Sequence, residues 1–292
     1  MIIRRILVLG AGGRLGKALL REYSGEFEVH GITHAELDLA KVDEIERVIS
    51  AAEFDLLINC AALTAVDYCE SHRDEAFAVN ARAPGMLAEL CQSRRAKLIH
   101  LSTDYVFDGA GELPYSEDDP ARPVSVYGES KLAGENAVLS VSPDFIVMRV
   151  SWVFGPDRPS FVDQLINRAR ETAHVSAVAD KVSTPTYTVD TASWLKLAWE
   201  NGATGVLHLA NTGQCSWQEY GQYAIDCCQR AGMELRARKV EPLKLAQMSN
   251  FIARRPVYTV LSTEKFTQLT GVTPRSWREA VAEYIGEHVA KR

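Results

Sequence analysis

The chain has 292 residues, of which 47% are hydrophobic and 24% are charged, and its formal net charge is −6 at pH 7. This length and composition predict a globular protein with one large domain or two unequal ones. The negative charge argues against non-specific nucleic-acid binding, which needs a basic face, and no segment reaches the roughly 20 apolar residues of a membrane-spanning helix.

The cysteines and the first residues indicate a compartment. The six cysteines include no C-x-x-C pair, so we interpret them as reduced thiols and expect no metal site among them. The apolar run after the first arginines is too short for a signal peptide and leads directly into a glycine loop. We therefore expect a cytoplasmic protein that binds neither nucleic acid nor membranes.

The first half of the chain alternates short apolar runs with helical patterns. The apolar runs, which we predict to be strands, cover residues 5–10, 26–32, 54–62, 96–104 and 144–152. The helical patterns cover residues 13–23, 41–52, 74–94 and 127–139. Apolar strands separated by helices indicate a parallel sheet that is covered on both faces. We predict a doubly wound α/β (Rossmann) domain over residues 1–150 that binds a dinucleotide.

The periodicity is less regular after residue 152. Helical patterns cover residues 160–171, 188–201, 216–232 and 276–292, and one apolar run covers residues 205–211. We predict that residues 151–292 form mainly a smaller, mixed α/β substrate-binding domain, with part of 186–210 joining the first domain. The two domains would enclose a cleft.

A glycine loop, "VLGAGGRLG", follows the first predicted strand and precedes the first predicted helix. Its G-x-x-G-x-x-G spacing allows a tight turn and lets a pyrophosphate approach the backbone at a helix N-terminus. A plain tight turn is the alternative, but the strand and helix are the context that supports the motif. The predicted cofactor residues of this loop are Gly10, Gly12, Gly13, Arg14, Leu15 and Gly16.

The end of the second predicted strand bears on the choice of cofactor. An acidic residue there would favour NAD, but residues 31–34 read Gly-Ile-Thr-His. Arg14 could contact a 2′-phosphate instead, or be a solvated first-turn arginine. We expect NADPH and keep NADH as the alternative. Asp38 and Leu39 could line the adenine pocket, although Asp38 could equally cap the helix that begins near Lys41.

Polar residues end the fourth predicted strand, at the sheet edge where parallel α/β proteins bind ligands. Thr103 and Asp104 lie there, and turn formation is their alternative role. Tyr127 and Lys131 then share one helical face, because they are four residues apart. A nearby ammonium lowers the pKa of a tyrosine from about 10 and suits it to general acid–base catalysis. The glycine loop, the strand-end hydroxyl and this pair, in that order, predict a catalytic set.

These motifs resemble the extended short-chain dehydrogenase/reductases, and within them the dTDP-4-dehydrorhamnose reductase branch, along essentially the whole chain. The matching segments are "GAGGRLG" at 10–16, "INCAALTAVDYCE" at 58–70, "LSTDYVFDG" at 101–109, "YGESKLAGE" at 127–135 and "TPTYTVDTA" at 184–192. The resemblance implies reduction of the C4 ketone of a dTDP-4-keto-6-deoxy sugar. Tyr127 would protonate the ketone oxygen, Lys131 would lower the Tyr127 pKa and hold the nicotinamide ribose, and Thr103 would bond the carbonyl.

The same resemblance implies further binding residues. The loop along the cofactor would comprise Cys60, Ala61, Ala62 and Thr64. The substrate side would comprise Asp67, Thr103, Asp104, Trp152 and Arg255. Core packing is the alternative role for Trp152, and a surface position is the alternative for Arg255.

One departure and two alternative functions stay open. The family pattern D-Q-x-G-x-P-T reads Asp-Lys-Val-Ser-Thr-Pro-Thr at 180–186, so Lys181 would either meet a diphosphate or be a solvated loop lysine. The chain could instead be a non-catalytic dinucleotide-binding subunit, like the regulatory subunit of methionine adenosyltransferase. It could also be a nucleotide-sugar epimerase or dehydratase, with Asp104 as an acid. A homodimer and a bound Mg²⁺ are both left open.

Overall fold

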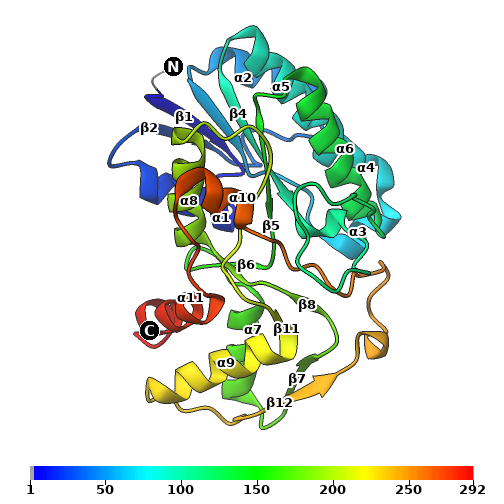
Figure 1. Ribbon diagram of the computed structural model, residues 1–292, viewed down its shortest axis with the longest axis vertical. Coiled ribbons are helices and arrows are strands. Elements are labelled where there is room, and N and C mark those ends of the chain that lie inside the picture. Colours follow the sequence, from blue (N-terminus) through cyan, green and yellow to red (C-terminus); the bar gives the residue numbers. More distant parts are fainter. Residues whose placement is uncertain (1–2, 292) are drawn as a thin grey trace.

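A parallel, six-stranded sheet forms the centre of the upper part of the molecule in Figure 1, a computed structural model that describes residues 3–291. Its strands are β1 (Arg5–Leu9), β2 (Glu28–Ile32), β3 (Leu56–Asn59), β4 (Lys97–Thr103), β5 (Ile146–Val150) and β10 (Gly205–His208). They lie in the order β10-β5-β4-β3-β1-β2, and every neighbouring pair is parallel. The predicted doubly wound α/β fold is confirmed.

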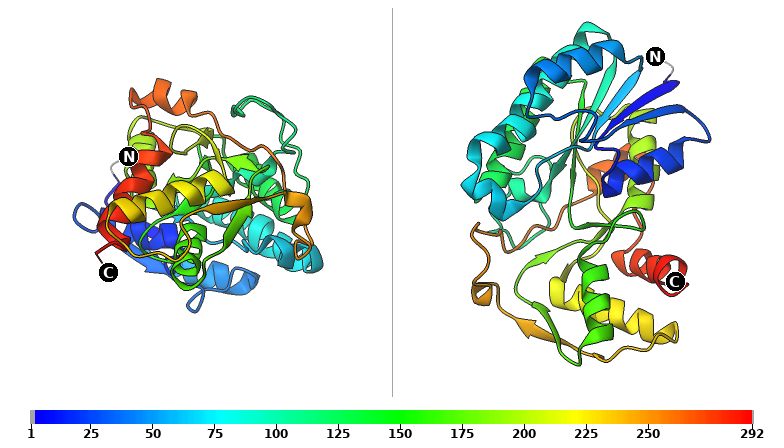
Figure 2. Two further views of the ribbon diagram at one scale, coloured as in Figure 1. Left: turned by 90° about the horizontal axis from the view of Figure 1, so that it is seen from below. Right: turned by 180° about the vertical axis from the view of Figure 1, so that it is seen from behind.

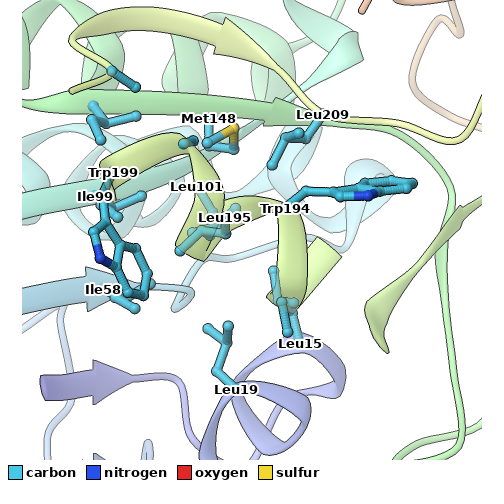
Figure 3. Packing of buried hydrophobic residues seen from close by; sticks show 14 of the residues in the cluster. Leu15, Leu19, Ile58, Ile99, Leu101, Met148, Trp194, Leu195, Trp199 and Leu209 are labelled. Atoms are coloured by element: carbon cyan, nitrogen blue, oxygen red, sulfur yellow. The ribbon is translucent and has the colours of Figure 1, made fainter. Parts of the chain in front are cut away.

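Both faces of this sheet are covered by helices, which explains why its strands are apolar throughout. On one face, α1 (Arg14–Tyr23) and α8 (Thr188–Glu200) pack on strand residues such as Ile58 and Met148, as Figure 3 shows. On the other face, α2 (Val42–Ala51), α5 (Ala83–Ser93) and α6 (Val126–Val141) cover the alternate strand residues, such as Leu57.

The helix predicted over residues 74–94 is interrupted. Beyond the short helices α3 (Val66–Ser71) and α4 (Arg73–Phe77), a π-helical turn, η1 (Ala78–Arg82), leads into α5. Pro84 explains the change, because it has no N–H to donate to the Asn80 carbonyl four residues earlier. The turn lets Asn80 enter the site described below.

The lower part of the molecule combines three helices with short strand pairs, as the two views of Figure 2 also show. The helices are α7 (Phe161–Glu171), α9 (Trp217–Arg230) and α11 (Trp277–Tyr284), and α11 continues into a π-helical turn, η4 (Ile285–Val289). Among the helices and strands predicted for residues 151–292, only the last extends to Arg292, which lies outside the described residues.

The short strands of the lower part have no counterpart among the sequence predictions. They pair as β6 (Val153–Phe154) with β9 (Thr186–Tyr187), β7 (Val175–Val178) with β12 (Val240–Leu243), and β8 (Val182–Ser183) with β11 (Cys215–Ser216). The remaining short elements are η2 (Asp104–Val106), η3 (Leu245–Gln247) and α10 (Glu264–Thr270). Two-residue strands leave no alternation that could be read in the sequence.

The chain returns to the sheet domain twice after residue 150. The segment that the sequence predicts to join the first domain supplies α8 and β10, and α10 packs against both of them through the buried Phe266. The lower part lies at the carboxyl ends of the strands (Figure 1). Within residues 3–291, no helix is long and apolar enough to cross a bilayer.

Candidate active site

The glycine loop lies at the point where the strand order of the sheet reverses. From β1 the chain goes to β2 on one side, and β3 then lies on the other side, which is where open α/β sheets bind ligands. Gly10 has a φ of +74°, and a Cβ there would lie 2.7 Å from the Ala61 nitrogen. At Gly16 a Cβ would lie 2.3 Å from the Gly10 carbonyl oxygen. These two glycines close the turn that leads from β1 into α1.

The residues of this loop fit the pyrophosphate of a dinucleotide. Gly13 is the N-cap of α1 and makes no side-chain cap bond, and the first turn holds no acidic residue. The free N–H groups and the positive end of the helix dipole therefore meet no internal anion. Gly12 is exposed, and the nearest atom to a Cβ built on it is 3.9 Å away. This open side of the turn is where an anion can approach.

Arg14, the first residue of α1, ties the glycine loop to the segment 153–159. Its Nε, Nη1 and Nη2 donate to the carbonyl oxygens of Arg158, Val153 and Pro159, at 3.0, 3.1 and 2.5 Å respectively. The alternative of a freely solvated arginine is wrong. A guanidinium has five N–H donors, so two remain for another acceptor.

A turn that sequence reading missed follows the end of β2, and a glutamate side chain closes it. The Glu36 carboxylate accepts from the Thr33 N–H at 2.8 Å and from the Thr33 hydroxyl at 2.7 Å. These bonds form a turn after the strand. The turn brings the Glu36 carboxylate back to Thr33, although Glu36 lies four residues beyond Ile32. Asp38 accepts from the Ala40 N–H at 3.0 Å, and Lys41 is the N-cap of α2, so Asp38 does not cap that helix. Leu39 is buried beside these turns.

The loop after β3, which holds Cys60, Ala61, Ala62 and Thr64, is fixed by buried amides. Asn59 accepts from the Ala61 N–H at 3.1 Å, and Asn80 both accepts from the Leu63 N–H at 2.8 Å and donates to the Leu63 carbonyl at 3.0 Å. Asn80 also donates to Ser130 of α6 at 3.0 Å. The loop is therefore tied to the helix that carries Tyr127 and Lys131.

The predicted catalytic residues come together at this edge. Thr103 ends β4, Tyr127 lies in the first turn of α6, and Lys131 lies one turn later. Thr103 accepts from the Tyr105 N–H at 3.2 Å, and the Tyr105 ring packs edge-on against the Tyr127 ring, with ring centres 5.6 Å apart. All three residues are at most 8% exposed. Ser125 starts α6 as its N-cap and accepts from the Gly128 N–H, so the phenol belongs to a well-defined helix start.

The electrostatics of this set differ from the sequence prediction. The Lys131 ammonium donates to the Leu101 carbonyl at 2.6 Å, and burial lowers the pKa of Lys131 to about 8. Burial raises the pKa of Tyr127, and the nearby Thr103 hydroxyl opposes the shift. Lys131 was expected to lower the pKa of the phenol, but desolvation of the phenolate dominates in this structure.

His100 completes the surroundings of Lys131, and no sequence motif pointed to it. Asn59 lies 3.1 Å from His100 Nδ1, and Lys131 Nζ lies 3.3 Å from His100 Nε2. The Asn59 oxygen is used by Ala61, so its amino group faces Nδ1 and the imidazole hydrogen is on Nε2. Burial, and secondarily the charge of Lys131, hold the pKa of His100 well below its usual value, which keeps the ring neutral.

Two predicted substrate residues bind each other. Arg255 donates to both carboxylate oxygens of Asp67, at 2.7 and 2.6 Å, and Asp67 also accepts from the Ile252 and Ala253 N–H groups. The hydrogen bond from Arg255 is the main cause that lowers the pKa of Asp67 to about 2. The pair ties α3 to the segment 251–256, and the Arg255 side chain is 7% exposed.

Trp152 and Lys181 are the remaining residues that the sequence assigns to substrate contacts. Trp152 has a φ of +37° and lines a cavity of about 170 Å³ together with Arg14, Phe161, Trp217 and Tyr220. A bulky residue at positive φ is strained and is held by its surroundings. Lys181 is fully buried, so the alternative of a solvated loop lysine is wrong. Among residues 3–291, no group of three His, Cys, Asp or Glu side chains is arranged to hold a metal ion.

Comparisons with known proteins match the chain along nearly its whole length. The RmlD substrate binding domain family matches residues 4–289. The dTDP-4-dehydrorhamnose reductase of Mycolicibacterium smegmatis is 38% identical over 290 residues, which cover 98% of this chain and 86% of that protein. A dTDP-4-dehydrorhamnose reductase structure from Clostridium acetobutylicum has a TM-score of 0.89 at 34% identity, covering 96% of this chain and 98% of that one. Another, from Bacillus anthracis in complex with NADP, has a TM-score of 0.89 at 30% identity, covering 97% and 99%.

Proposed function

The chain belongs to the RmlD substrate binding domain family, and on this basis we propose that it reduces the C4 ketone of a dTDP-4-keto-6-deoxy sugar, converting dTDP-4-dehydrorhamnose to dTDP-L-rhamnose with NADPH. The observation that carries the proposal is the meeting of Thr103, Tyr127 and Lys131 beside the open glycine loop. A proton donor next to a dinucleotide site is what reduction of a ketone requires.

In this proposal Tyr127 transfers the proton, and the start of α1 binds the cofactor. NADPH, when bound, supplies hydride to the C4 carbon. The Tyr127 hydroxyl then donates its proton to the ketone oxygen, so that C4 becomes a secondary alcohol and Tyr127 a phenolate. The phenol of Tyr127 is protonated before the reaction, as a proton donor must be, and a bound positive charge would favour the phenolate that follows. The N–H groups at the start of α1 would hold the pyrophosphate.

Lys131 would stabilise the phenolate that the reaction leaves. It is a buried cation one helical turn from Tyr127, and the Leu101 carbonyl takes one of the three N–H groups of its ammonium. We propose that the remaining groups face the nicotinamide ribose and the phenolate. The Leu101 carbonyl would keep the ammonium at this depth.

The cofactor and the substrate would approach from different walls of the cleft. We propose that the cofactor contacts Gly10, Gly12, Gly13, Arg14, Leu15 and Gly16, then Asp38 and Leu39, and then the 60–64 loop, with the two unused N–H donors of Arg14 available to a 2′-phosphate. We propose that the sugar nucleotide contacts Trp152, Thr103 and the Asp67–Arg255 pair. The free thiols suit a reducing compartment, which supports a cytoplasmic location.

The alternative functions receive less support. A dehydratase needs a free acid near the sugar, whereas Asp104 is buried and accepts hydrogen bonds from three hydroxyl groups. A regulatory subunit needs no proton donor, whereas this chain keeps Thr103, Tyr127 and Lys131 and buries all three.

Replacement of Tyr127 by phenylalanine tests the proposal. The change removes only the phenolic oxygen, so we expect turnover of dTDP-4-dehydrorhamnose to fall by about 10²–10⁴, the usual contribution of a general acid. The affinity for NADPH should change little. Tyr223→Phe on α9, where the ring packs on Trp277, is the matched control. Turnover is followed by the loss of reduced-nicotinamide absorbance, and NADPH affinity by fluorescence titration.

Two outcomes would refute the assignment. Near-wild-type turnover of Tyr127→Phe would remove Tyr127 from the mechanism. A wild-type protein that binds NADPH but reduces no dTDP-, UDP- or GDP-linked 4-keto sugar would support the regulatory alternative instead.

A further inference from the structure

A chain of hydrogen-bonding groups runs from the loop after β3 to Lys131. The Ala61 N–H donates to the Asn59 side-chain oxygen at 3.1 Å, and the Asn59 amide nitrogen lies 3.1 Å from His100 Nδ1. His100 Nε2 lies 3.3 Å from Lys131 Nζ, which donates to the Leu101 carbonyl at 2.6 Å. The side chains of this chain are at most 2% exposed. The reaction described above uses Lys131 but assigns nothing to Asn59 or His100.

Asn59 decides which nitrogen of the His100 ring carries the hydrogen. Its oxygen is occupied by the Ala61 N–H, so its NH₂ group, which can only donate, faces Nδ1. Nδ1 is therefore an acceptor, and the hydrogen of the neutral ring lies on Nε2. A Cβ built on Gly134 of α6 would lie 3.5 Å from Nε2, so this edge of the ring lies against the helix that carries Lys131.

The charged and the neutral forms of Lys131 meet this hydrogen differently. An ammonium has three N–H donors and no acceptor, so its contact with the His100 Nε2–H brings two donors together. A neutral amine still donates to the Leu101 carbonyl and also has a lone pair, which can accept the Nε2–H. Only the neutral amine satisfies both contacts, and an unsatisfied donor is costly in a buried site.

We propose that the Asn59–His100 pair stabilises the neutral amine of Lys131 and thereby sets the pH at which Lys131 loses its charge. His100 is then a positioning residue that acts on the reaction through Lys131, an inference that rests on the proposed function. The reductase needs the charged form to stabilise the Tyr127 phenolate, so the pair sets the alkaline limit of activity. A hydrogen bond to the neutral form adds to the effect of burial, which lowers the pKa of Lys131 to about 8.

The other titratable groups around Lys131 come from three elements. Glu135 lies one turn further along α6, and its carboxylate raises the pKa of Lys131, while Tyr127 lies one turn earlier on the same helix. Cys60 follows β3, and burial raises the pKa of its thiol to about 12. From β4, burial holds the pKa of His100 well below its usual value. Cys60 and His100 are therefore neutral at the pH at which Lys131 changes charge.

The position of the His100 hydrogen is measured directly by NMR. In ¹⁵N-labelled protein, two-bond ¹H–¹⁵N correlation spectra distinguish the ring nitrogen that carries hydrogen from the one that does not. His100→Phe identifies the His100 signals among those of the seven histidines. We expect a neutral ring with its hydrogen on Nε2 from about pH 6 to about pH 10, and an Nε2 shift that changes as Lys131 titrates.

Three NMR results would overturn the proposal: a hydrogen on Nδ1, a positively charged ring in this pH range, or an Nε2 shift that does not respond to pH. The measurement needs neither cofactor nor substrate. It therefore tests the pair even if the protein reduces no keto sugar, which would refute only the proposed function.

Two replacements of Asn59 shift the hydrogen. Asn59→Asp keeps one oxygen for the Ala61 N–H and presents the other to Nδ1, so the hydrogen moves to Nδ1 and Nε2 accepts from the Lys131 ammonium. Asn59→Leu adds no charge and removes the donor to Nδ1, so the ring can again place its hydrogen on Nδ1. The double variant His100→Phe/Asn59→Asp, compared with His100→Phe, gives the effect of the added carboxylate without the imidazole.

The pH profile of kcat/KM is measured for these variants with dTDP-4-dehydrorhamnose and NADPH. We expect the alkaline limb to move upward by about one pH unit in Asn59→Leu and by about one to three in Asn59→Asp, with a smaller shift when His100→Phe is present. Ser130→Ala is the matched control, because it removes the acceptor of the Asn80 amide and loosens the same loop without changing the contact of His100 with Lys131. An unmoved limb in both Asn59 variants, an undiminished shift with His100→Phe present, or an equal shift in Ser130→Ala would overturn the proposal.

Discussion

Arg149→Met should destabilise the protein strongly, because it leaves a buried carboxylate without its partner. Arg149 of β5 donates from Nε to Glu135 Oε1 at 2.9 Å and from Nη2 to Oε2 at 2.7 Å. The two side chains are 5% and 2% exposed. Ser102, next to Thr103, also donates to Glu135 at 2.5 Å. The pair thus joins α6, β4 and β5 beneath the active site.

The size of the loss follows from these contacts. Hydrogen bonds to charged groups contribute about 1.5–3 kcal/mol each, and removal of one partner of a buried ion pair costs about 3–5 kcal/mol. Two short bonds and nearly complete burial place Arg149→Met at the upper end of this range, a change of about 10²–10⁴ in the unfolding equilibrium. Glu135→Leu should cost a similar amount, since it leaves the guanidinium buried.

Urea unfolding of both single variants and of Glu135→Leu/Arg149→Met measures the free energies. Circular dichroism and tryptophan fluorescence should give the same midpoint if the transition is two-state. We expect the double variant to be much more stable than the sum of the single losses predicts, because apolar side chains then replace both charges. Additive losses, or a loss below about 1 kcal/mol for Arg149→Met, would refute the reasoning.

Two further changes test the site. Arg14→Ala should lower the affinity for NADPH more than the affinity for NADH, measured by fluorescence titration. The control, Arg21→Ala on the same helix, should change both affinities equally. Equal losses of the two affinities in Arg14→Ala would mean that Arg14 only holds the 153–159 loop. Since burial lowers the pKa of Lys131 to about 8, its ammonium loses its proton as pH rises through 8, and kcat/KM should fall there. Lys131→Met should lack that limb, and a wild-type profile that is level through pH 8 would contradict the assignment.

Much of the sheet domain could be predicted because its signals are local. The run at 54–62 is apolar since β3 is buried on both faces, and the glycines of the loop are needed within the turn itself. Glu36 shows where local reading stops. It lies beyond the end of β2 in the sequence, and only the fold of the turn brings its carboxylate back to Thr33.

The parts of the site that depend on distant partners could not be predicted. His100 lies inside an apolar strand, and its meeting with Lys131 requires α6 to pack on β4. The sequence around Lys181 is typical of an exposed loop. Its burial depends on β8, where Ser183 bonds Asp104 in the turn after β4. For the same reason the sign of the Tyr127 pKa shift was missed, because burial is a property of the assembled cleft and not of the Y-x-x-x-K spacing.

The three carbonyl bonds of Arg14 make the first turn of α1 part of a mechanical link to residues 153–159. A movement of the lower part that displaces those carbonyls must also act on the glycine turn, where we propose that the pyrophosphate binds. A ligand bound at one wall of the cleft would therefore change the affinity for a ligand at the other wall. Such a coupling of affinities is equal in both directions. On the proposed function, loss of the Arg14 guanidinium would therefore weaken the dependence of each ligand's affinity on the presence of the other.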